Sequence, residues 1–392
     1  MTKYVEVSSS SQRTIYIVKS NNSRAIFKGG ITRVENFFYS ELLKKEQSSF
    51  RVFPVVWDGK IFVVNNENRL VNPRKVFRKK QVSVWNPAKN DILFFQTSEL
   101  LQSLEVGKIE SFKDECKIAV SIYDILPITH PEWFTDYLGE AFLRFFDSSW
   151  NFSDLLIVNC NKTKGDIETY TASKEVSVRQ NLPIIKKVDL WSVATPKKQI
   201  REKQGDNSPK AMKIFANTDP ILLLLSTVEP RKGHEELIDA AKLAWSQGAK
   251  FNLLFIGQLG WISKSFKTEY QEFLGIEKNR AIWFDSVEDH ELEEFMSTTN
   301  MLISPSLDEG YGLPIAEALQ RGIPVLANGI PTYKELFGNH VVLYGPGESF
   351  ESLQNALINV ENVMVNGKTL LDSVQFPNTD SVSDLLESFG EI

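Results

Sequence analysis

Residues 304–319 read SPSLDEGYGLPIAEAL, and this stretch is the clearest indication of the fold in the sequence. The apolar run that ends at Ser304 has the length of a buried strand, and Pro314 suits the first turn of a helix. The loop between them holds Gly310 and Gly312, which permit a close approach of the backbone to a ligand. The stretch therefore predicts a strand, a glycine-rich loop and a helix, which together form the repeating unit of an α/β fold.

Two carboxylates accompany this loop, Glu309 within it and Glu317 about one turn into the helix. The first amides of a helix are unpaired donors with a partial positive charge, so they can bind anions or sugar oxygens. Both carboxylates can face one ligand and accept hydrogen bonds from sugar hydroxyls. Alternatively, this is an ordinary glycine-rich loop with two surface glutamates.

Two cations, Arg231 and Lys232, follow the apolar run at residues 221–225 and precede a predicted helix. Cations at the carboxyl end of a strand are well placed to neutralise a diphosphate. The alternative is a solvated basic turn. Gly257 ends another predicted strand in the same way, and there the alternative is a plain turn.

Alternating strands and helices recur in both halves of the chain. A β-branched run at residues 14–18 predicts a strand, and Gly29 and Gly30 precede a helical pattern over residues 31–45. The pattern predicts two doubly wound domains with parallel sheets, which bind ligands beyond the carboxyl ends of the strands. We expect residues 183–210, rich in Lys, Pro, Asp and Asn, to link the two domains.

Composition excludes several classes of protein. The 392 residues carry a net charge of −6, which argues against a nucleic-acid-binding polycation. Residues 1–200 sum to +7 and residues 201–392 to −13, so the halves are expected to meet different partners. The two cysteines form no Cys-x-x-Cys pair, and neither a secretory signal nor a membrane-spanning apolar run is evident. We expect a cytoplasmic protein, or one bound peripherally at the inner face of a membrane.

The second half resembles retaining nucleotide-sugar glycosyltransferases of glycosyltransferase family 4, which have the GT-B fold. The Glu-x7-Glu motif of that family is EGYGLPIAE, from Glu309 to Glu317. Four further segments match in register: Glu229–Lys232, residues 289–292, Pro305-Ser306 and residues 322–325. The resemblance implies two Rossmann-like domains facing a central cleft.

The first half matches the family more loosely. Gly29 and Gly30 resemble its glycine loop, which approaches the donor diphosphate. Asp124 lies in a segment that resembles its His-Asp-x-x-Pro motif, although Tyr123 replaces the histidine. The resemblance implies an acceptor-binding domain at residues 1–200 and a donor-binding domain at residues 201–376. The last helix, about residues 377–392, would pack back on the first domain.

The resemblance implies transfer of a hexosyl unit from a nucleoside-diphosphate sugar to a hydroxyl of a glycan or lipid-linked glycan. The match is closest to bacterial mannosyltransferases of O-antigen or capsular polysaccharide synthesis, which favours GDP-mannose as donor. No Asp-x-Asp signature is present, so neither a metal nor another cofactor is expected. The alternative is a non-catalytic nucleotide-sugar or glycan-binding subunit of a glycosylation complex.

The family also implies a role for each site residue. Glu317 would hold the ribose, Glu309 the donor hexose, and Arg231 and Lys232 the leaving diphosphate. The amides of Tyr311, Gly312 and Leu313 would contact the donor, with Gly257 nearby. Asp124 is a further catalytic candidate, and alternatively it caps a turn.

A basic cluster at residues 74–80, RKVFRKK, is the densest in the first half. One hypothesis is that it approaches anionic lipid headgroups or a pyrophosphate-linked lipid acceptor. The alternative is a solvated basic face.

Overall fold

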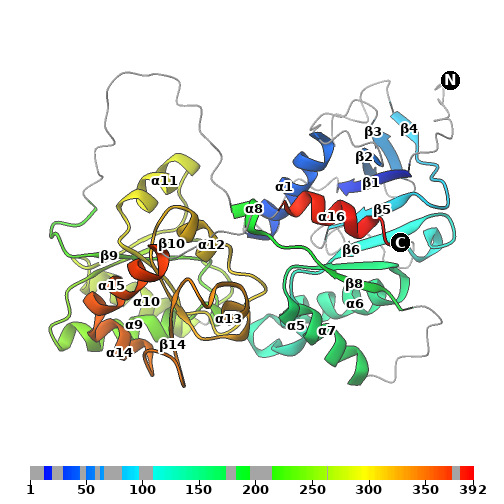
Figure 1. Ribbon diagram of the computed structural model, residues 1–392. Coiled ribbons are helices and arrows are strands. Elements are labelled where there is room, and N and C mark those ends of the chain that lie inside the picture. Colours follow the sequence, from blue (N-terminus) through cyan, green and yellow to red (C-terminus); the bar gives the residue numbers. More distant parts are fainter. Residues whose placement is uncertain are drawn as a thin grey trace, which may run out of the picture. The chain divides into compact units, whose positions relative to one another are not determined.

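The computed structural model describes residues 13–19, 30–44, 50–57, 62–65, 82–96, 109–173, 182–194, 214–262, 264–372 and 380–392 (Figure 1). The chain divides into two compact units. The first unit comprises Met1–Pro131, Asp136–Val193 and Thr379–Ile392, and the second comprises Glu132–Thr135 and Ala194–Asn378.

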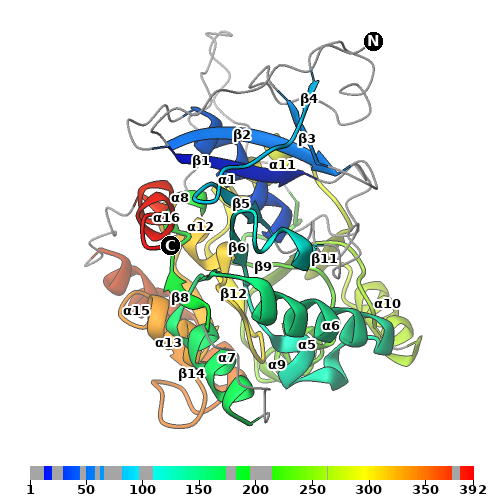
Figure 2. The same cartoon turned by 90° about the vertical axis from the view of Figure 1, so that its right-hand side faces the viewer.

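The first unit contains an eight-stranded sheet in the order β4-β3-β2-β1-β5-β6-β7-β8 (Figure 2). Its strands are β1 (Arg13–Lys19), β2 (Phe50–Trp57), β3 (Phe62–Asn65), β4 (Val82–Val84), β5 (Ile92–Phe95), β6 (Lys117–Ser121), β7 (Leu155–Val158) and β8 (Ile184–Lys187). Its helices are α1 (Gly30–Lys44), α5 (Leu126–Thr129), α6 (Asp136–Phe152), α7 (Asn161–Ser173), α8 (Trp191–Ala194), which ends at the boundary of the unit, and α16 (Ser381–Phe389).

Helices cover both faces of this sheet, because side chains alternate along its buried strands. On β5, Leu93 and Phe95 pack into one hydrophobic cluster with Phe145 and Phe146 of α6. Phe94 points the other way, and its ring lies 5.2 Å from that of Phe389 on α16. The first unit is therefore doubly wound.

The C-terminal helix α16 belongs to this first unit although it follows the whole second unit in sequence. Asp380 caps its first turn by accepting from the amides of Val382 and Ser383. Arg13 at the start of β1 donates to the carbonyl of Phe389 at 3.2 Å. Lys186 on β8 also forms an ion pair with Glu391 at 2.6 Å.

The structure corrects two local predictions for the first unit. The boundary between the units, after Val193, lies within the expected linker at residues 183–210, but that stretch also contains β8, which pairs in parallel with β7. Its four residues are half-buried or exposed, because β8 is an edge strand, and such strands carry a weak apolar pattern. The sheet is also mixed, since β3 pairs antiparallel with both β2 and β4.

A short segment, Glu132–Thr135, groups with the second unit although the chain on both sides of it belongs to the first. The Trp261 indole donates to the carbonyl of Trp133 at 2.7 Å, and its ring lies 5.8 Å from that of Phe134. No local sequence pattern indicates this exchange, because it depends on a contact between residues 128 positions apart.

The second unit has a six-stranded sheet in the order β11-β10-β9-β12-β13-β14, parallel throughout. Its strands are β9 (Ile221–Leu225), β10 (Asn252–Ile256), β11 (Ala281–Phe284), β12 (Met301–Ser304), β13 (Val325–Asn328) and β14 (Val342–Tyr344). Its helices are α9 (His234–Ser246), α10 (Lys264–Ile276), α11 (Asp289–Thr298), α12 (Leu313–Gln320), α13 (Pro331–Phe337), α14 (Leu353–Ile358) and α15 (Val360–Asp372).

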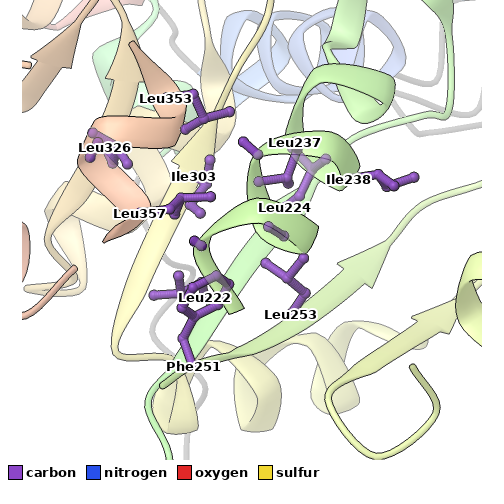
Figure 3. Packing of buried hydrophobic residues seen from close by; sticks show 14 of the residues in the cluster. Leu222, Leu224, Leu237, Ile238, Phe251, Leu253, Ile303, Leu326, Leu353 and Leu357 are labelled. Carbon is purple, nitrogen blue, oxygen red and sulfur yellow. The ribbon is translucent and has the colours of Figure 1, made fainter. Parts of the chain in front are cut away.

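The core of this second unit forms where α9 and α14 pack on β9 and its neighbours (Figure 3). One buried cluster contains Leu222 and Leu224 of β9, Leu237 of α9, and Leu353 and Leu357 of α14. The apolar run at residues 221–225 thus forms the buried central strand that continuous hydrophobicity predicts.

Helix α9 offers a matched pair of substitutions that tests this packing. Leu237 is fully buried, whereas Leu243 on the same helix is 40% exposed. We expect Leu237→Ala to lower the free energy of unfolding by about 2–5 kcal/mol, because it leaves a cavity. Leu243→Ala should cost less than about 1 kcal/mol, since it removes little buried surface. Urea unfolding followed by tryptophan fluorescence measures both, and equal losses would contradict the assigned orientation of α9.

Candidate functional site

Strand order in the second unit creates a natural binding position between β9 and β12. The chain runs outward from β9 through β10 and β11, then returns to place β12 on the other side of β9. At such a reversal the loops after the two central strands diverge, and ligands bind there beyond the strand ends. These loops hold residues 226–233 and 305–312, the two segments singled out in the sequence.

Three predicted residues meet at this position. The Arg231 guanidinium lies 2.9 Å from Oε2 of Glu309, and the Lys232 ammonium contacts Oε1 of the same carboxylate. The three side chains are only 10–16% exposed. The two cations, which lie 78 and 77 positions from Glu309 in the sequence, therefore form one ion-paired group with it beyond the carboxyl ends of β9 and β12.

Glycines let the two loops approach closely enough for these contacts. Gly233, at φ 70°, turns the chain from the cations into α9, and a Cβ there would lie 2.1 Å from the carbonyl oxygen of Pro305. The Leu307 amide also donates to the carbonyl of Arg231 at 2.8 Å. Close backbone packing between the two loops thus supports the contacts between their side chains.

Several further groups hold Glu309 in place. The Ser306 hydroxyl donates to Oε1 of Glu309 at 2.9 Å, and the Glu309 amide donates to Oδ1 of Asp308 at 2.7 Å. Thr332, the second residue of α13, donates to the Glu309 carbonyl at 2.7 Å. The carboxylate is held in place at both its side chain and its backbone.

This environment keeps Glu309 ionised. Burial alone would raise the pKa of its carboxyl, but the charges of Lys232 and Arg231 and the hydrogen bonds from Lys232 and Ser306 lower that pKa to about 2. Glu309 is therefore an anion at any physiological pH and does not act as a general acid.

A second carboxylate, Glu229, adjoins this group. Its Oε2 lies 3.2 Å from Nε of Arg231, and the side chain is 8% exposed. Burial raises the pKa of Glu229, against the opposing effects of Arg231 and Lys232. Together Glu229, Arg231, Lys232 and Glu309 form a buried cluster, hereafter the four-charge cluster, with a formal sum of zero.

His234 lies beneath this cluster at the start of α9. Burial, with the nearby charge of Lys232, lowers the pKa of its imidazole to about 3, so the ring stays neutral. It stacks on Phe255 with the ring centres 6.1 Å apart. His234 is a packing residue by this geometry.

Helix α12 carries the remaining residues of the motif. Gly312 caps it at φ 100°, where a Cβ would lie 2.7 Å from the Tyr333 ring. Tyr311 is buried, with its ring 5.8 Å from that of Phe337. Leu313 opens the helix, and Glu317 is 2% exposed on its second turn.

The other predicted residues lie elsewhere or serve other contacts. Gly257 directly follows β10, and a Cβ there would lie 1.9 Å from the carbonyl oxygen of Ser226. The glycine is therefore needed for close packing between the segments that follow β10 and β9. Gly30 begins α1 in the first unit, whereas Gly29 and the basic cluster at residues 74–80 lie outside the described residues. Asp124 accepts from the amide of Leu126 at 3.1 Å, which is the capping contact of the alternative reading.

Sequence reasoning assigned no role to Glu229, Ser306 or Thr332. Glu229 and Ser306 belong to the matched segments Glu229–Lys232 and Pro305-Ser306. Their polar side chains, close in sequence to Arg231 and Glu309, are the signal that could have identified them. Thr332 lies 23 positions from Glu309, and only the placement of β13 beside β12 brings it close.

The described residues contain neither a metal-binding cluster nor a membrane-spanning helix. In the part of the chain that the structure describes, no three His, Cys, Asp or Glu side chains gather closely enough to hold a metal ion. No helix among the described residues is both long and apolar enough to cross a bilayer.

This fold and motif define a class of protein. Residues 208–363 match the family model described as "Glycosyl transferases group 1". The chain therefore carries a glycosyltransferase group 1 domain, which lies within the second unit.

Two curated relatives are mannosyltransferases by name. The chain is 26% identical over 334 residues to the serotype-specific mannosyltransferase WbdA of Escherichia coli, covering 84% of this chain and 40% of that protein. It is 23% identical over 246 residues to the O-antigen chain mannosyltransferase RfbU of Salmonella typhimurium, covering 62% of this chain and 61% of the relative. The chain thus spans well under half the length of WbdA.

Solved structures share the fold. Anabaena Alr3699/HepE, in complex with UDP and glucose, aligns with a TM-score of 0.61 and 17% identity over 97% of this chain and all of that one. WaaG, a glycosyltransferase involved in lipopolysaccharide biosynthesis, aligns at 0.52 with 14% identity over 97% and 99% of the two chains. The expected fold class, GT-B with two doubly wound α/β domains, is confirmed.

Acid unfolding tests the assigned ion pairs of Glu309. Glu309→Gln should lower the free energy of unfolding by about 3–5 kcal/mol at neutral pH, because it removes the carboxylate that pairs with both buried cations and leaves Arg231 with Glu229 alone. A carboxylate whose pKa falls on folding contributes stability that is lost as the pH drops through the folded value. The difference between the two proteins should therefore shrink from pH 4.5 toward about 2. Urea unfolding at several pH values measures it.

The exposed Glu235→Gln on α9 serves as the control and should change little at any pH. A stability difference for Glu309→Gln that stays constant with pH would contradict the ionised state of Glu309.

Proposed function

We propose that the chain is a retaining glycosyltransferase that moves a hexosyl unit, with mannose favoured, from a nucleoside-diphosphate sugar to a hydroxyl of a glycan or lipid-linked glycan. The observation that carries the proposal is the convergence of Arg231 and Lys232 on Glu309 between β9 and β12. The names of WbdA and RfbU support mannosyl transfer, and the UDP and glucose bound to HepE support a nucleotide-sugar donor.

The chemistry requires stabilisation of the negative charge that develops on the leaving diphosphate. Arg231 and Lys232 emerge together from one short turn, Pro230–Lys232, and Glu309 holds both side chains in position before any ligand arrives. Charges that are already oriented need no reorganisation as the reaction proceeds, which is the main source of electrostatic catalysis. The proposal includes no metal, since the two cations supply the positive charge.

Glu309 and Glu317 complete the proposed donor site. In this proposal Glu309 accepts from hydroxyls of the donor hexose, and Glu317 from those of the ribose. The amides of Tyr311, Gly312 and Leu313, at the start of α12, contact the sugar or phosphates. The acceptor hydroxyl attacks the anomeric carbon on the face from which the diphosphate leaves, so the configuration is retained. Asp124 is kept as a catalytic candidate of the first unit.

Cytoplasmic location and contact with an inner membrane surface through residues 74–80 are part of the same proposal. An acceptor attached to a lipid would favour such contact.

The second candidate function is a non-catalytic nucleotide-sugar or glycan-binding subunit. The four-charge cluster favours the enzyme, because a binding subunit needs no oriented cations at the leaving group. Hydrolysis or transfer of the donor by purified protein distinguishes the two.

Loss of one cation tests the assigned stabilisation of the leaving group. Lys232→Ala should lower kcat about 100- to 1,000-fold, because one oriented donor to a developing charge is lost. The control is Lys242→Ala on α9, where the lysine is 44% exposed and kcat should not change. Release of nucleoside diphosphate from GDP-mannose, UDP-glucose and dTDP-rhamnose, each with added acceptor glycan, measures the rate. Near-normal turnover of Lys232→Ala would contradict the assigned role.

Truncation of Glu317 tests the proposed ribose contact. Glu317→Ala should raise the Kd for the donor about 10-fold or more, because a charge-assisted hydrogen bond contributes about 1.5–3 kcal/mol. Titration calorimetry with the nucleotide sugar measures the change, and the 2′,3′-dideoxy nucleotide, which lacks both ribose hydroxyls, should bind the wild type and the variant alike. Unchanged donor affinity in Glu317→Ala would exclude the contact.

A further inference from the structure

We propose that Glu229 takes up a proton when a nucleoside-diphosphate sugar binds at Arg231 and Lys232, and releases it when the diphosphate leaves. The inference rests on the proposed donor site and adds to it a charge-balancing residue that the motif comparison left without a role.

The two carboxylates of the four-charge cluster are held unequally. Glu309 accepts from three donors: Arg231, Lys232 and the Ser306 hydroxyl. For Oε2 of Glu229, the contact in the described ranges is the Nε of Arg231 at 3.2 Å, in a geometry poorly aligned for a hydrogen bond. The ionised form of Glu229 is thus the less stabilised of the two.

Glu229 is also largely buried, and part of its side chain packs against backbone. A Cβ at Gly260 would lie 2.9 Å from Cγ of Glu229, and the Gly260 amide donates to the carbonyl of Val228 at 3.0 Å. The loop after β10 therefore packs directly on this side chain. A buried carboxylate without good donors is the group most readily protonated when its surroundings become more negative.

A bound diphosphate makes the surroundings more negative in two ways. It adds at least two negative charges to a cluster whose formal sum is zero. It also draws on the Arg231 guanidinium, which is the nearest cation to Glu229. Protonation of Glu229 removes one negative charge and converts an acceptor into an O–H donor. Solvent or buffer supplies the proton.

The other charged groups around Glu229 cannot take this proton in its place. Those that act on it are Arg231 and Lys232 of its own loop and Glu309 of the loop after β12. Arg231 and Lys232 contribute positive charge, and three donors keep Glu309 ionised, with a pKa of about 2. His234 is buried against aromatic rings and remains neutral.

Calorimetry in buffers of different ionisation enthalpy counts the protons that accompany binding. The probes are GDP-mannose, UDP-glucose and dTDP-rhamnose, whose esterified phosphates do not titrate near neutral pH. We expect the wild type to take up as much as one proton per bound nucleotide sugar. By linkage, the Kd should then rise with pH, by up to about 10-fold per pH unit where the proton is taken up.

The test variant is Glu229→Gln, which keeps the shape of the side chain but cannot ionise. We expect its proton uptake to vanish and the pH dependence of its Kd to flatten, whatever its affinity. The matched control, Glu235→Gln, removes an exposed carboxylate of α9 and should keep the uptake of the wild type. Infrared difference spectra of the wild type provide a measurement that needs no variant, because a newly protonated carboxyl appears on binding.

The outcomes separate this inference from the proposed function. Binding without proton uptake, or uptake that persists in Glu229→Gln, overturns the role of Glu229 and leaves the donor site standing. Failure of all three nucleotide sugars to bind the wild type overturns the donor site itself, and the inference with it.

Discussion

The ion pairs of Glu309 with Arg231 and Lys232 are the interaction on which the site depends. Three charged side chains that are at most 16% exposed must balance one another, because an unpaired buried charge costs several kcal/mol. The balance is reached between two loops that follow different strands. The position of the cations, the state of the carboxylate and the orientation of both loops therefore depend on the same contacts.

Close backbone packing makes these ion pairs geometrically accessible. A Cβ at Gly233 would collide with Pro305, one at Gly257 with Ser226, and one at Gly312 with the ring of Tyr333. Each of these glycines adopts a positive φ at the carboxyl end of the sheet. The glycines therefore act first on the protein itself, by drawing the loops together, and any approach to a ligand builds on that.

Unequal support for two carboxylates links the resting site to its proposed chemistry. The firmly held Glu309 fixes the cations at the proposed diphosphate position, whereas the poorly supported Glu229 would allow the cluster to change its charge. A net-neutral cluster is stable in the absence of ligand because its charges cancel. The same cluster accepts an anion because one of its carboxylates can be neutralised.

Local signals in the sequence predict the alternating strands and helices of the second unit from β9 to β14, since continuous apolar runs, helical periodicity and glycine turns each fall within a short window. The same signals point to Arg231, Lys232 and Glu309, because charged residues that follow buried strands are conspicuous there. Which of these side chains touch depends on the tertiary structure, which also supplies Glu229, Ser306 and Thr332 as their supports. It also placed the edge strand β8 within the expected linker, and Glu132–Thr135 within the second unit. These features depend on contacts between distant residues, and no local pattern encodes them.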